Sequence, residues 1–522
     1  MVKYLIAFTA CFLLVSESLA QYGSLDYTFS GDGITTLDMN DDDIATAVAV
    51  QPDSKILVAG YTSDGGAEDL AVVRFNYDGS LDNAFANNGI LQLSTTSNSD
   101  ERIYDMGIDS SGSIFLAGST RNNSNSIDKF LIVKCKNTGI LDSTFNGKGW
   151  ANTSISGDMD IAYAMALQPD GKIVLGGVNT LNNGDIGFAR YKANGSLDTS
   201  FSNDGKTSVS YLDDYGGVLQ DLKIQPDGKI VGCGYEGTPS GDYDIMVVRL
   251  NPDGSPDSSF NTTGYLVMDY NSEFNYGWTL DLRPDGRILV GGSTFENGSF
   301  KVFLLQLLGD GTLDPAFGTG GITTLYPGSG GQEASALKIL PDSGILICGL
   351  NTSPVADFAL IRCKANGTLD STFGNGGITI TDFNFYADQA MAMALTPDNK
   401  VVLSGYSKDF TLDNDFAVAR YDNDFATSME NHHLNESPGF GVFPNPAGRE
   451  LTLRFEQSTN SNVTITIKSC DKRVSFTAFN GYCSAGKFEK QFTLPPTVIP
   501  GFYLIEVLDD HGLRTSKLLI AM

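Results

Sequence analysis

Histidine is scarce in this sequence of 522 residues, and none occurs before residue 432. The three histidines are His432, His433 and His511. Catalytic triads, many general bases and most zinc sites depend on histidine. The long histidine-free part of the chain therefore argues against these classes of site there.

The chain also lacks C-x-x-C pairs, long apolar segments and an excess of positive charge. Its seven cysteines do not have the spacing of zinc or redox sites. No segment reaches the roughly 18 apolar residues of a membrane-spanning helix. Lys and Arg total 34 against 62 Asp and Glu, and the resulting net charge of −28 repels phosphate backbones and anionic lipids. We therefore expect no nucleic acid partner and no transmembrane segment.

The first twenty residues have the three parts of a secretory signal peptide. Lys3 gives a basic start, residues 4–15 are apolar, and Ser18-Leu19-Ala20 has the small-x-small pattern of a cleavage site. We predict that residues 1–20 are removed on export. Among the remaining cysteines, Cys470 and Cys483 are the one candidate disulfide pair, and the sequence leaves open whether they are bonded. The other four lie at repeated positions and are expected to be buried in strands.

Three motifs recur seven times within residues 21–425. One is G-x-x-D-x-x-F, one resembles P-D-G-K-I, and one is a strand that ends in a long polar residue. The first motif returns at intervals of 56–60 residues. The recurring residues are Phe29, Phe85, Phe145, Phe201, Phe260, Phe317 and Phe373; Pro52, Ser110, Pro169, Pro226, Pro284, Pro341 and Pro397; and Arg74, Lys134, Arg190, Arg249, Gln306, Arg362 and Arg420.

Each repeat contains four short strand-like segments, which lie at 162–167, 172–177, 185–191 and 206–210 in the third copy. Gly and Asp at the breaks suit tight turns. This pattern predicts one blade of a β-propeller. The first segment alternates small and large apolar residues, so we expect an innermost strand buried on both faces.

The phase of the repeat predicts how the ring closes. A lone strand at residues 33–37 precedes the first full repeat, and the last repeat stops after residues 415–421, one strand short. Pairing these two strands would leave no open edge. We therefore predict an all-β protein: a seven-bladed β-propeller at 21–425 with four strands per blade, closed by its N-terminal strand.

The G-x-L-D-x-x-F and Q-P-D-G-K-I motifs resemble the delta-60 repeat family of exported bacterial proteins over about residues 22–425. Two copies depart from the family pattern: the second has Ser110-Ser111-Gly112, and the fifth has Pro256 where leucine is usual. The resemblance implies a propeller-like fold and no established chemistry.

A polar linker at 426–440 precedes a segment of alternating strands at 441–522, which predicts a small Ig-like β-sandwich. This segment resembles the type A C-terminal sorting domain of the type IX secretion system of Bacteroidetes. The resemblance rests on Pro444, Asn445, Pro446, Gly501, Tyr503 and Lys517. It implies the type IX machinery as a partner and a secreted or cell-surface location. The ending at residues 520–522 is less basic than usual, and an ordinary adhesive sandwich is the alternative.

Two kinds of residue are candidates for a binding site, whereas the repeated aspartates and arginines are expected to cap turns and form structural ion pairs. Carboxylates in irregular loops, Asp42, Asp43, Asp160 and Asp214, would suit Ca²⁺; a solvated acidic surface is the alternative. Tyr104, Tyr163 and Trp278 occupy one equivalent position, six residues before the second motif. They would stack on a sugar ring or peptide, or else pack between blades.

These features support three functional hypotheses. We predict that the protein is not an enzyme but an exported propeller that binds a polysaccharide, peptide or surface protein, with no cofactor except possible Ca²⁺ and no catalytic residue. The alternative is an enzyme, a lyase or hydrolase that acts on a polysaccharide or lactone. A third hypothesis is a structural surface protein without a small ligand.

Overall fold

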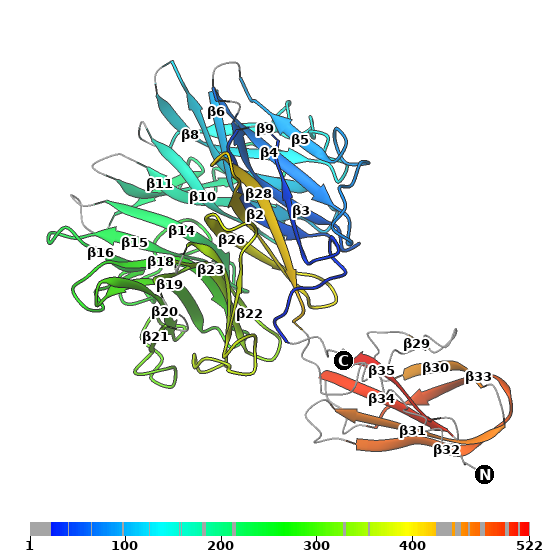
Figure 1. The fold of residues 1–522 in the computed structure, drawn as a ribbon. Coiled ribbons are helices and arrows are strands. Elements are labelled where there is room, and N and C mark those ends of the chain that lie inside the picture. The colour runs from blue at the N-terminus through cyan, green and yellow to red at the C-terminus, as the bar shows by residue number, and fades with distance from the viewer. Residues whose placement is uncertain are drawn as a thin grey trace, which may run out of the picture. The chain divides into compact units, whose positions relative to one another are not determined.

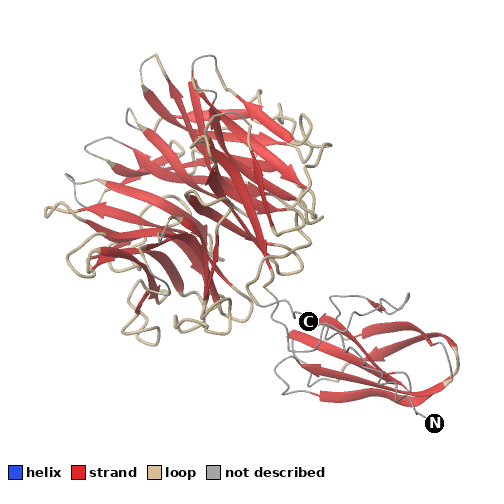
Figure 2. Ribbon diagram, viewed as in Figure 1, coloured by secondary structure: helices blue, strands red, loops and turns tan. Residues whose placement is uncertain are grey.

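The structure is a computed structural model of the chain. It describes residues 22–520 except 40, 64, 97–98, 125, 156, 158, 180–183, 211–215, 327–329, 353–354, 424–440, 444–449, 458–459, 470–474, 496–500 and 510–511. Every regular element among these residues is a β-strand (Figure 2). The chain divides into two compact units, Met1–Phe425 and Ala426–Met522, which we describe separately. No helix in the described part of the chain has the length and hydropathy needed to cross a membrane.

The first unit contains seven four-stranded antiparallel sheets, which we number in chain order. Sheets 1 to 4 have the following strands. Sheet 1 is β2 (Asp43–Val50), β3 (Ile56–Ser63), β4 (Glu68–Phe75) and β5 (Ile90–Leu93); sheet 2 is β6 (Ser99–Ile108), β7 (Ile114–Asn122), β8 (Ile127–Cys135) and β9 (Trp150–Thr153). Sheet 3 is β10 (Asp160–Leu167), β11 (Ile173–Asn179), β12 (Asp185–Tyr191) and β13 (Lys206–Val209); sheet 4 is β14 (Gly217–Ile224), β15 (Ile230–Gly237), β16 (Tyr243–Leu250) and β17 (Tyr265–Met268).

Sheets 5 to 7 repeat this order, except that the last sheet takes its fourth strand from the other end of the unit. Sheet 5 is β18 (Asn275–Leu282), β19 (Ile288–Glu296), β20 (Ser299–Leu307) and β21 (Ile322–Leu325); sheet 6 is β22 (Gln332–Ile339), β23 (Ile345–Asn351), β24 (Asp357–Cys363) and β25 (Ile378–Thr381). Sheet 7 is β26 (Asp388–Leu395), β27 (Val401–Lys408), β28 (Asn414–Tyr421) and β1 (Ile34–Leu37).

The seven sheets form a closed ring with the first strand of each full repeat innermost (Figure 1). Each of these strands contacts the next one, and β26 contacts β2. The predicted pairing of the N-terminal strand is confirmed, since Ile34 pairs with Ala419 and Leu37 with Phe416. The pairing removes the exposed edge that β28 would otherwise present.

The core of the first unit is divided among the junctions between neighbouring sheets. Seven hydrophobic clusters each combine residues of two adjacent sheets, and each contains one of the repeated phenylalanines. All seven phenylalanines are buried, as predicted. Their repetition gives every junction the same packing unit, so the sequence period sets the geometry of the ring.

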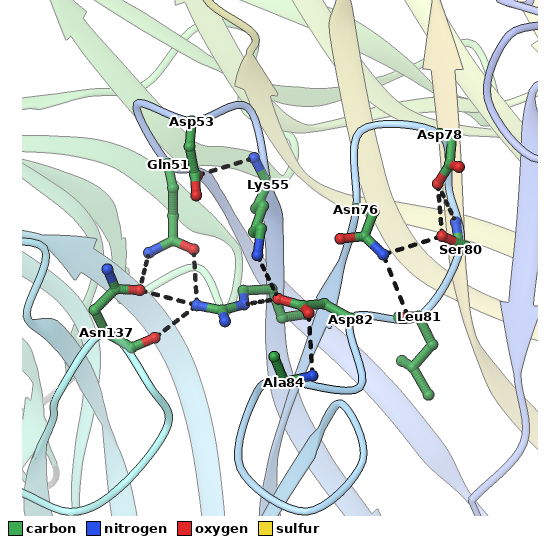
Figure 3. Close-up of polar contacts among 11 residues, drawn as sticks. Gln51, Asp53, Lys55, Asn76, Asp78, Ser80, Leu81, Asp82, Ala84 and Asn137 are labelled. Atoms are coloured by element: carbon green, nitrogen blue, oxygen red, sulfur yellow. Dashed lines mark hydrogen bonds and ion pairs between the residues drawn. The ribbon is translucent and has the colours of Figure 1, made fainter.

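The repeated aspartates and long polar residues form the predicted structural network. Asp82 accepts the Ala84 amide at 3.1 Å and the Lys55 ammonium at 2.8 Å (Figure 3). Arg74 Nε donates to Asp82 at 2.7 Å, and Arg74 Nη1 donates to the Asn137 carbonyl of sheet 2 at 2.6 Å. Charge-assisted bonds of this kind are stronger than neutral ones. The motif therefore caps its own turn and also ties one sheet to the next.

The same aspartate pairing occurs in all seven copies. The pairs are Arg74–Asp82, Lys134–Asp142, Arg190–Asp198, Arg249–Asp257, Gln306–Asp314, Arg362–Asp370 and Arg420–Asp26. In the fifth copy, where glutamine replaces the cation, Arg287 also reaches Asp314, at 3.0 Å. These aspartates therefore serve the fold.

Each innermost strand contains a β-bulge, which the sequence analysis did not foresee. The pairing skips one residue at the equivalent place in all seven strands. A glycine pairs with the residue just before each bulge; these are Gly60, Gly118, Gly177, Gly234, Gly292, Gly349 and Gly405. A Cβ at Gly177 would lie 1.9 Å from the Ile161 carbonyl oxygen, and the other six sites are equally tight. No residue larger than glycine fits there.

The bulge corrects the prediction that the innermost strands are buried on both faces. In β10, Ala162 and Ala164 are buried, but Tyr163 between them is only half-buried. The extra residue shifts the alternation of side chains along the strand by one and changes the direction of the bulged side chain. The bulged residue, Tyr163 in β10, therefore lies apart from the packed junctions between sheets.

The second unit contains a three-stranded and a four-stranded sheet. Their orders are β29-β30-β33 and β32-β31-β34-β35. The strands are β29 (Gly441–Phe443), β30 (Glu450–Gln457), β31 (Ser461–Ser469), β32 (Ser475–Cys483), β33 (Gly486–Thr493), β34 (Gly501–Asp509) and β35 (Gly512–Ile520). Leu453 and Phe492 of the first sheet share one buried cluster with Ile465 and Val507 of the second. The two sheets therefore pack face to face.

Candidate functional site

The seven bulged residues meet around one cavity on the axis of the ring. These residues are Thr46, Tyr104, Tyr163, Gln220, Trp278, Ser335 and Met391. The cavity has a volume of about 280 Å³, and Glu333, Ala334 and Gln389 complete its lining. Every sheet contributes its bulged residue. Because the backbone repeats while these side chains differ, the cavity is the place where the symmetric ring presents an asymmetric surface.

Aromatic rings cover part of the cavity wall. Tyr104 and Tyr163 meet edge to face with their ring centroids 4.9 Å apart. Trp278 is nearly parallel to Tyr276, at 5.2 Å and 17°. The Trp278 indole nitrogen donates to Ser293 Oγ at 3.2 Å, which fixes the orientation of the indole ring. This combination of rigid rings with polar ends is typical of binding surfaces.

Polar groups lie on the sheets 6 and 7 side of the cavity. Burial raises the pKa of Glu333 above its usual value. Gln389 Oε1 accepts the Tyr406 hydroxyl at 3.0 Å, so its amide orientation is fixed. The cavity thus combines aromatic rings, an oriented amide and one carboxyl group that holds its proton at higher pH than an exposed glutamate.

Charged residues further along the innermost strands tie neighbouring sheets together. Lys223 Nζ lies 2.6 Å from Asp221 Oδ1, and Asp221 Oδ2 accepts the Leu280 amide of sheet 5 at 2.9 Å. Asp105 Oδ2 accepts the Met165 amide of sheet 3 at 2.7 Å. Burial raises the pKa of Asp105 to about 7, although Lys223 opposes this shift. These bonds to backbone amides give the residues a structural role.

The three predicted aromatic residues, Tyr104, Tyr163 and Trp278, all line the cavity. The predicted aspartates do not gather into one site. Asp42 is exposed and accepts the Asn414 side-chain amide at 2.6 Å, whereas Asp43 is buried at the junction of sheets 7 and 1. Asp160 is buried at the start of sheet 3 and accepts the Ile155 amide at 2.9 Å. Asp214 lies outside the described residues.

The sorting-motif residues have partial structural descriptions. Pro444, Asn445 and Pro446 lie outside the described residues, as do residues 1–21, the linker at 426–440 and Cys470. Gly501 and Tyr503 belong to β34, and Lys517 belongs to β35. Cys483 is buried on β32.

Sequence reasoning missed Gln220, Glu333 and Gln389 as cavity residues. Gln220 occupies the same position as the three aromatic residues, six residues before the second motif, so comparison of all seven copies would have identified it. Glu333 and Gln389 are each two residues before the bulged residue of their strand. Their access to the cavity follows from the bulge, for which the paired glycine was the available signal.

The ring of repeated sheets defines the chain as a β-propeller repeat protein. Five stretches, residues 51–85, 168–201, 225–260, 283–317 and 340–373, match the family model of the DUF5122 β-propeller, a domain of unknown function. No curated protein matches the sequence.

Solved structures with a similar fold have low sequence identity. The polysaccharide lyase Uly1 is 12% identical with a TM-score of 0.44, and the match covers 73% of this chain and 90% of that one. An ulvan lyase of family PL25, bound to a saccharide, is 11% identical with a TM-score of 0.42, covering 75% and 96%. A protein of unknown function from Dyadobacter fermentans is 11% identical with a TM-score of 0.39, covering 75% and 99%. At these identities the likeness concerns the fold alone.

These comparisons contradict the prediction that the protein is not an enzyme. Polysaccharide lyases are among the structures that resemble it. The prediction relied on the missing histidines, and it was wrong because this residue type is only one of several that can transfer protons. Carboxyl groups whose pKa is raised, as that of the partly buried Glu333 is, can also do so.

Proposed function

We propose that the protein is an exported, seven-bladed β-propeller that binds a polysaccharide segment in the axial cavity and acts on it as a lyase or hydrolase. The observation that carries this proposal is the convergence of seven equivalent bulged residues on one cavity, three of them aromatic. The seven four-stranded sheets are its blades.

The lining of the cavity suits a sugar better than an apolar ligand. Aromatic rings stack against the C–H faces of sugars, while amide and hydroxyl groups bind their hydroxyls. Trp278 and Tyr163 supply rings, and Gln220, Gln389 and Ser335 supply polar groups. The volume of about 280 Å³ lies near the lower end for ligand pockets, which fits a short segment of a longer chain.

Glu333 is the candidate proton-transfer residue of this site. Burial raises its pKa, so a larger share of the side chains is protonated near neutral pH than for an exposed glutamate. A protonated carboxyl can donate to a leaving glycosidic oxygen, and the carboxylate can take up a proton. Tuning by burial is a common way in which a carboxyl group is fitted to acid–base catalysis.

Tryptophan fluorescence tests binding directly, because the chain has two tryptophans. Trp150 lies on β9, the outermost strand of sheet 2, so a Trp150→Phe protein reports on Trp278 alone. A glycan array would identify binding saccharides, and titration of that protein with them should change its fluorescence. Tyr163→Ala should weaken binding at least about tenfold, whereas the exposed Tyr326→Ala should not. Equal binding by the two variants would refute the cavity as the site.

Catalysis is tested with the saccharides that bind. Glu333→Gln keeps the size of the side chain and removes its titration, so it should retain binding and lose turnover. Reducing ends report hydrolysis, and unsaturated products with ultraviolet absorbance report elimination. Binding without either product in the unmodified protein would refute the enzymatic part of the proposal. Full activity in Glu333→Gln would exclude this residue as the acid or base.

The export route and cellular location of the protein are part of the same proposal. We assign residues 1–20 as a signal peptide and residues from about Phe440 onward as an Ig-like sorting domain recognised by the type IX secretion machinery. The motif order supports this, together with a separate compact unit whose two sheets share one core. The protein would then pass through the periplasm to the cell surface or medium.

Deletion of residues 516–522 tests the assignment of the sorting domain. In a host that has the type IX system, the truncated protein should accumulate in the periplasm while the full chain reaches the surface or medium. Fusion of residues 440–522 to an unrelated exported reporter should carry that reporter outside. Surface delivery of the truncated protein would indicate an adhesive sandwich instead.

A further inference from the structure

Three positions recur at every junction between neighbouring sheets. One lies on the third strand of a sheet, five residues before its long polar residue. The second immediately follows the fourth strand, and the third lies on the innermost strand of the next sheet, nine residues before the second motif. At two junctions all three positions are aspartate; the two sets are Asp357, Asp382 and Asp388, and Asp415, Asp38 and Asp43.

Within each set the carboxylates converge. One oxygen from each of the three aspartates lies within 4.8 Å of the other two. In the first set Asp357 and Asp388 are buried, and Asp382 is exposed. This arrangement gives a cluster of negatively charged side chains between sheets 6 and 7, of which Asp382 is exposed to solvent.

The first set has a buried oxygen atom that lacks a hydrogen bond. Asp388 is 0% exposed, and its Oδ2 accepts the Phe383 amide at 2.8 Å. Its Oδ1 is buried without a hydrogen-bond partner. Ser407 pairs with Asp388 across the sheet, so the two side chains point to the same face, and the Ser407 hydroxyl favours the charged form of the Asp388 carboxyl. A buried oxygen such as Asp388 Oδ1 is costly to leave without a partner unless something binds it.

Within the described part of the chain, no lysine or arginine forms an ion pair with the first set. The charged neighbours that act on Asp357 are Asp382 and Asp388. Burial, and then these two carboxylates, raise the pKa of Asp357 to about 6. By contrast, lysine occupies the position of Asp357 at the junctions of sheets 2–3 and 5–6, as Lys129 and Lys301. The two all-aspartate junctions therefore carry three acidic residues at these positions, whereas no other junction carries more than two.

We infer that each of these two junctions binds one Ca²⁺ ion. The ligands would be the three aspartates at each junction, and Ser407 would be a further oxygen ligand at the first. The three carboxylate oxygens of each set lie within 4.8 Å of one another, so a single Ca²⁺ ion can reach all of them at its usual distance of about 2.4 Å. Ca²⁺ accepts oxygen ligands in flexible geometry, whereas Mg²⁺ requires a nearly ideal octahedron and gives up its bound water reluctantly.

Both sites adjoin sheet 7, where the two ends of the first unit pair. Asp388 is the first residue of β26, Asp415 lies on β28, and Asp38 follows β1; all three strands belong to sheet 7. The ions would thus join sheet 7 to sheet 6 on one side and to sheet 1 on the other. Outside the cell, where calcium is present, the bound ions would stabilise the closed ring. This effect would not depend on any saccharide.

Calcium titration of the full chain, freed of metal with a chelator, tests the inference. Calorimetry should show two saturable sites per chain, and Ca²⁺ should raise the melting temperature more than Mg²⁺ does. Asp382→Asn and Asp38→Asn should each remove one site, with affinity there reduced at least about tenfold, and the double variant should remove both. Asp382 is exposed and caps the Asn384 and Phe385 amides, which asparagine can also do, so this change preserves the turn.

Asp269→Asn is the matched control. Asp269 caps the equivalent turn at the junction of sheets 4 and 5, where Asn275 replaces the third aspartate. This variant should keep both sites and the full calcium effect. Absence of saturable binding in the unmodified chain would overturn the inference. A calcium effect that persists in a folded double variant would also overturn it, because diffuse binding to a chain of net charge −28 would then explain the effect.

Discussion

Arg420 and Asp26 are 394 residues apart in the sequence and form an ion pair with an Nε–Oδ2 distance of 2.6 Å. The Arg420 side chain is fully buried, and it also donates to the Tyr77 carbonyl of sheet 1. The pair is the same one that other copies make between residues eight apart. The ring is thus closed by a standard repeat contact whose two halves lie at opposite ends of the unit.

Asp26→Asn should destabilise the closed ring strongly. The variant leaves the buried Arg420 without its carboxylate, and breaking a buried pair in this way costs about 3–5 kcal/mol. Asparagine can still cap the Thr28 amide, so the effect reports the lost charge. Urea denaturation should show a lower midpoint. Asp32→Asn, which replaces a turn aspartate without a cation partner in the described structure, should shift the midpoint little; equal shifts would argue against the role of this pair.

Gly177→Ala should be far more harmful than its size suggests. The added Cβ would meet the Ile161 carbonyl oxygen at 1.9 Å, which the paired backbone cannot relieve. Overpacking typically lowers the free energy of unfolding by about 1–3 kcal/mol, and we expect a larger decrease here. It would be seen as a low melting temperature or as failure to fold. Gly309→Ala is the control, because its nearest neighbour would be 3.7 Å away. A mild effect at Gly177 would mean that the bulge relaxes easily.

Stability should fall steeply in acid. Hydrogen bonds from Thr144 and Lys134 lower the pKa of Asp142 to about 2. Burial raises the pKa of the other six repeated aspartates, but hydrogen bonds and nearby cations outweigh it and leave each pKa below its usual value. A lowered pKa stabilises the fold above the unfolded value of about 3.9, and this contribution is lost as pH falls through the folded value.

The melting temperature should therefore drop between about pH 4 and pH 2. Circular dichroism across this range measures the drop. Asp142→Asn should be less stable at neutral pH and should show a shallower acid transition, since one of the seven titrating groups is gone. Parallel curves for the two proteins would show that Asp142 does not contribute.

The four repeat cysteines should be unreactive in the native protein. Cys135, Cys233, Cys348 and Cys363 are buried in strands, as predicted. Burial raises the pKa of Cys135, Cys348 and Cys363 to about 12, so almost no reactive thiolate forms at pH 8. In a chain that lacks residues 1–20 and carries serine at 470 and 483, a thiol reagent should label none of the four until urea is added. Rapid native labelling of any of them would indicate local opening of the ring.

Much of the fold could be predicted because each repeat records the same local requirements. Phe201 and its equivalents mark the packed junctions, and Asp198 marks the turn that Arg190 pairs with. The segments predicted in the third copy differ from β10 to β13 by at most two residues at any end. Closure of the ring by β1 followed from counting strands, because an unpaired strand edge is unfavourable in water.

The candidate site was only partly predictable. Trp278 and Tyr163 were chosen for their equivalent position, but Glu333 was not, because its access to the cavity depends on the bulge at Ser335. A bulge changes which face a side chain occupies, and the apolar alternation of the strand does not reveal it. The acidic candidates do not share one site, because Asp43 and Asp160 belong to different junctions, and the loop sequences do not reveal this separation.

The sequence by itself determined the period, the strands of each repeat, the turn and ion-pair network, and the closure of the ring. These features depend on contacts within one repeat or between equivalent residues of neighbouring repeats. The same sequence signal for them therefore occurs in each of the seven copies. The tertiary structure alone decided which side chains share the axis and which carboxylates meet between sheets. Tyr104 and Trp278 lie in different repeats, and Asp38 and Asp415 lie near opposite ends of the first unit. Only the closed curvature of the ring brings the first two residues to one cavity and the second two to one junction.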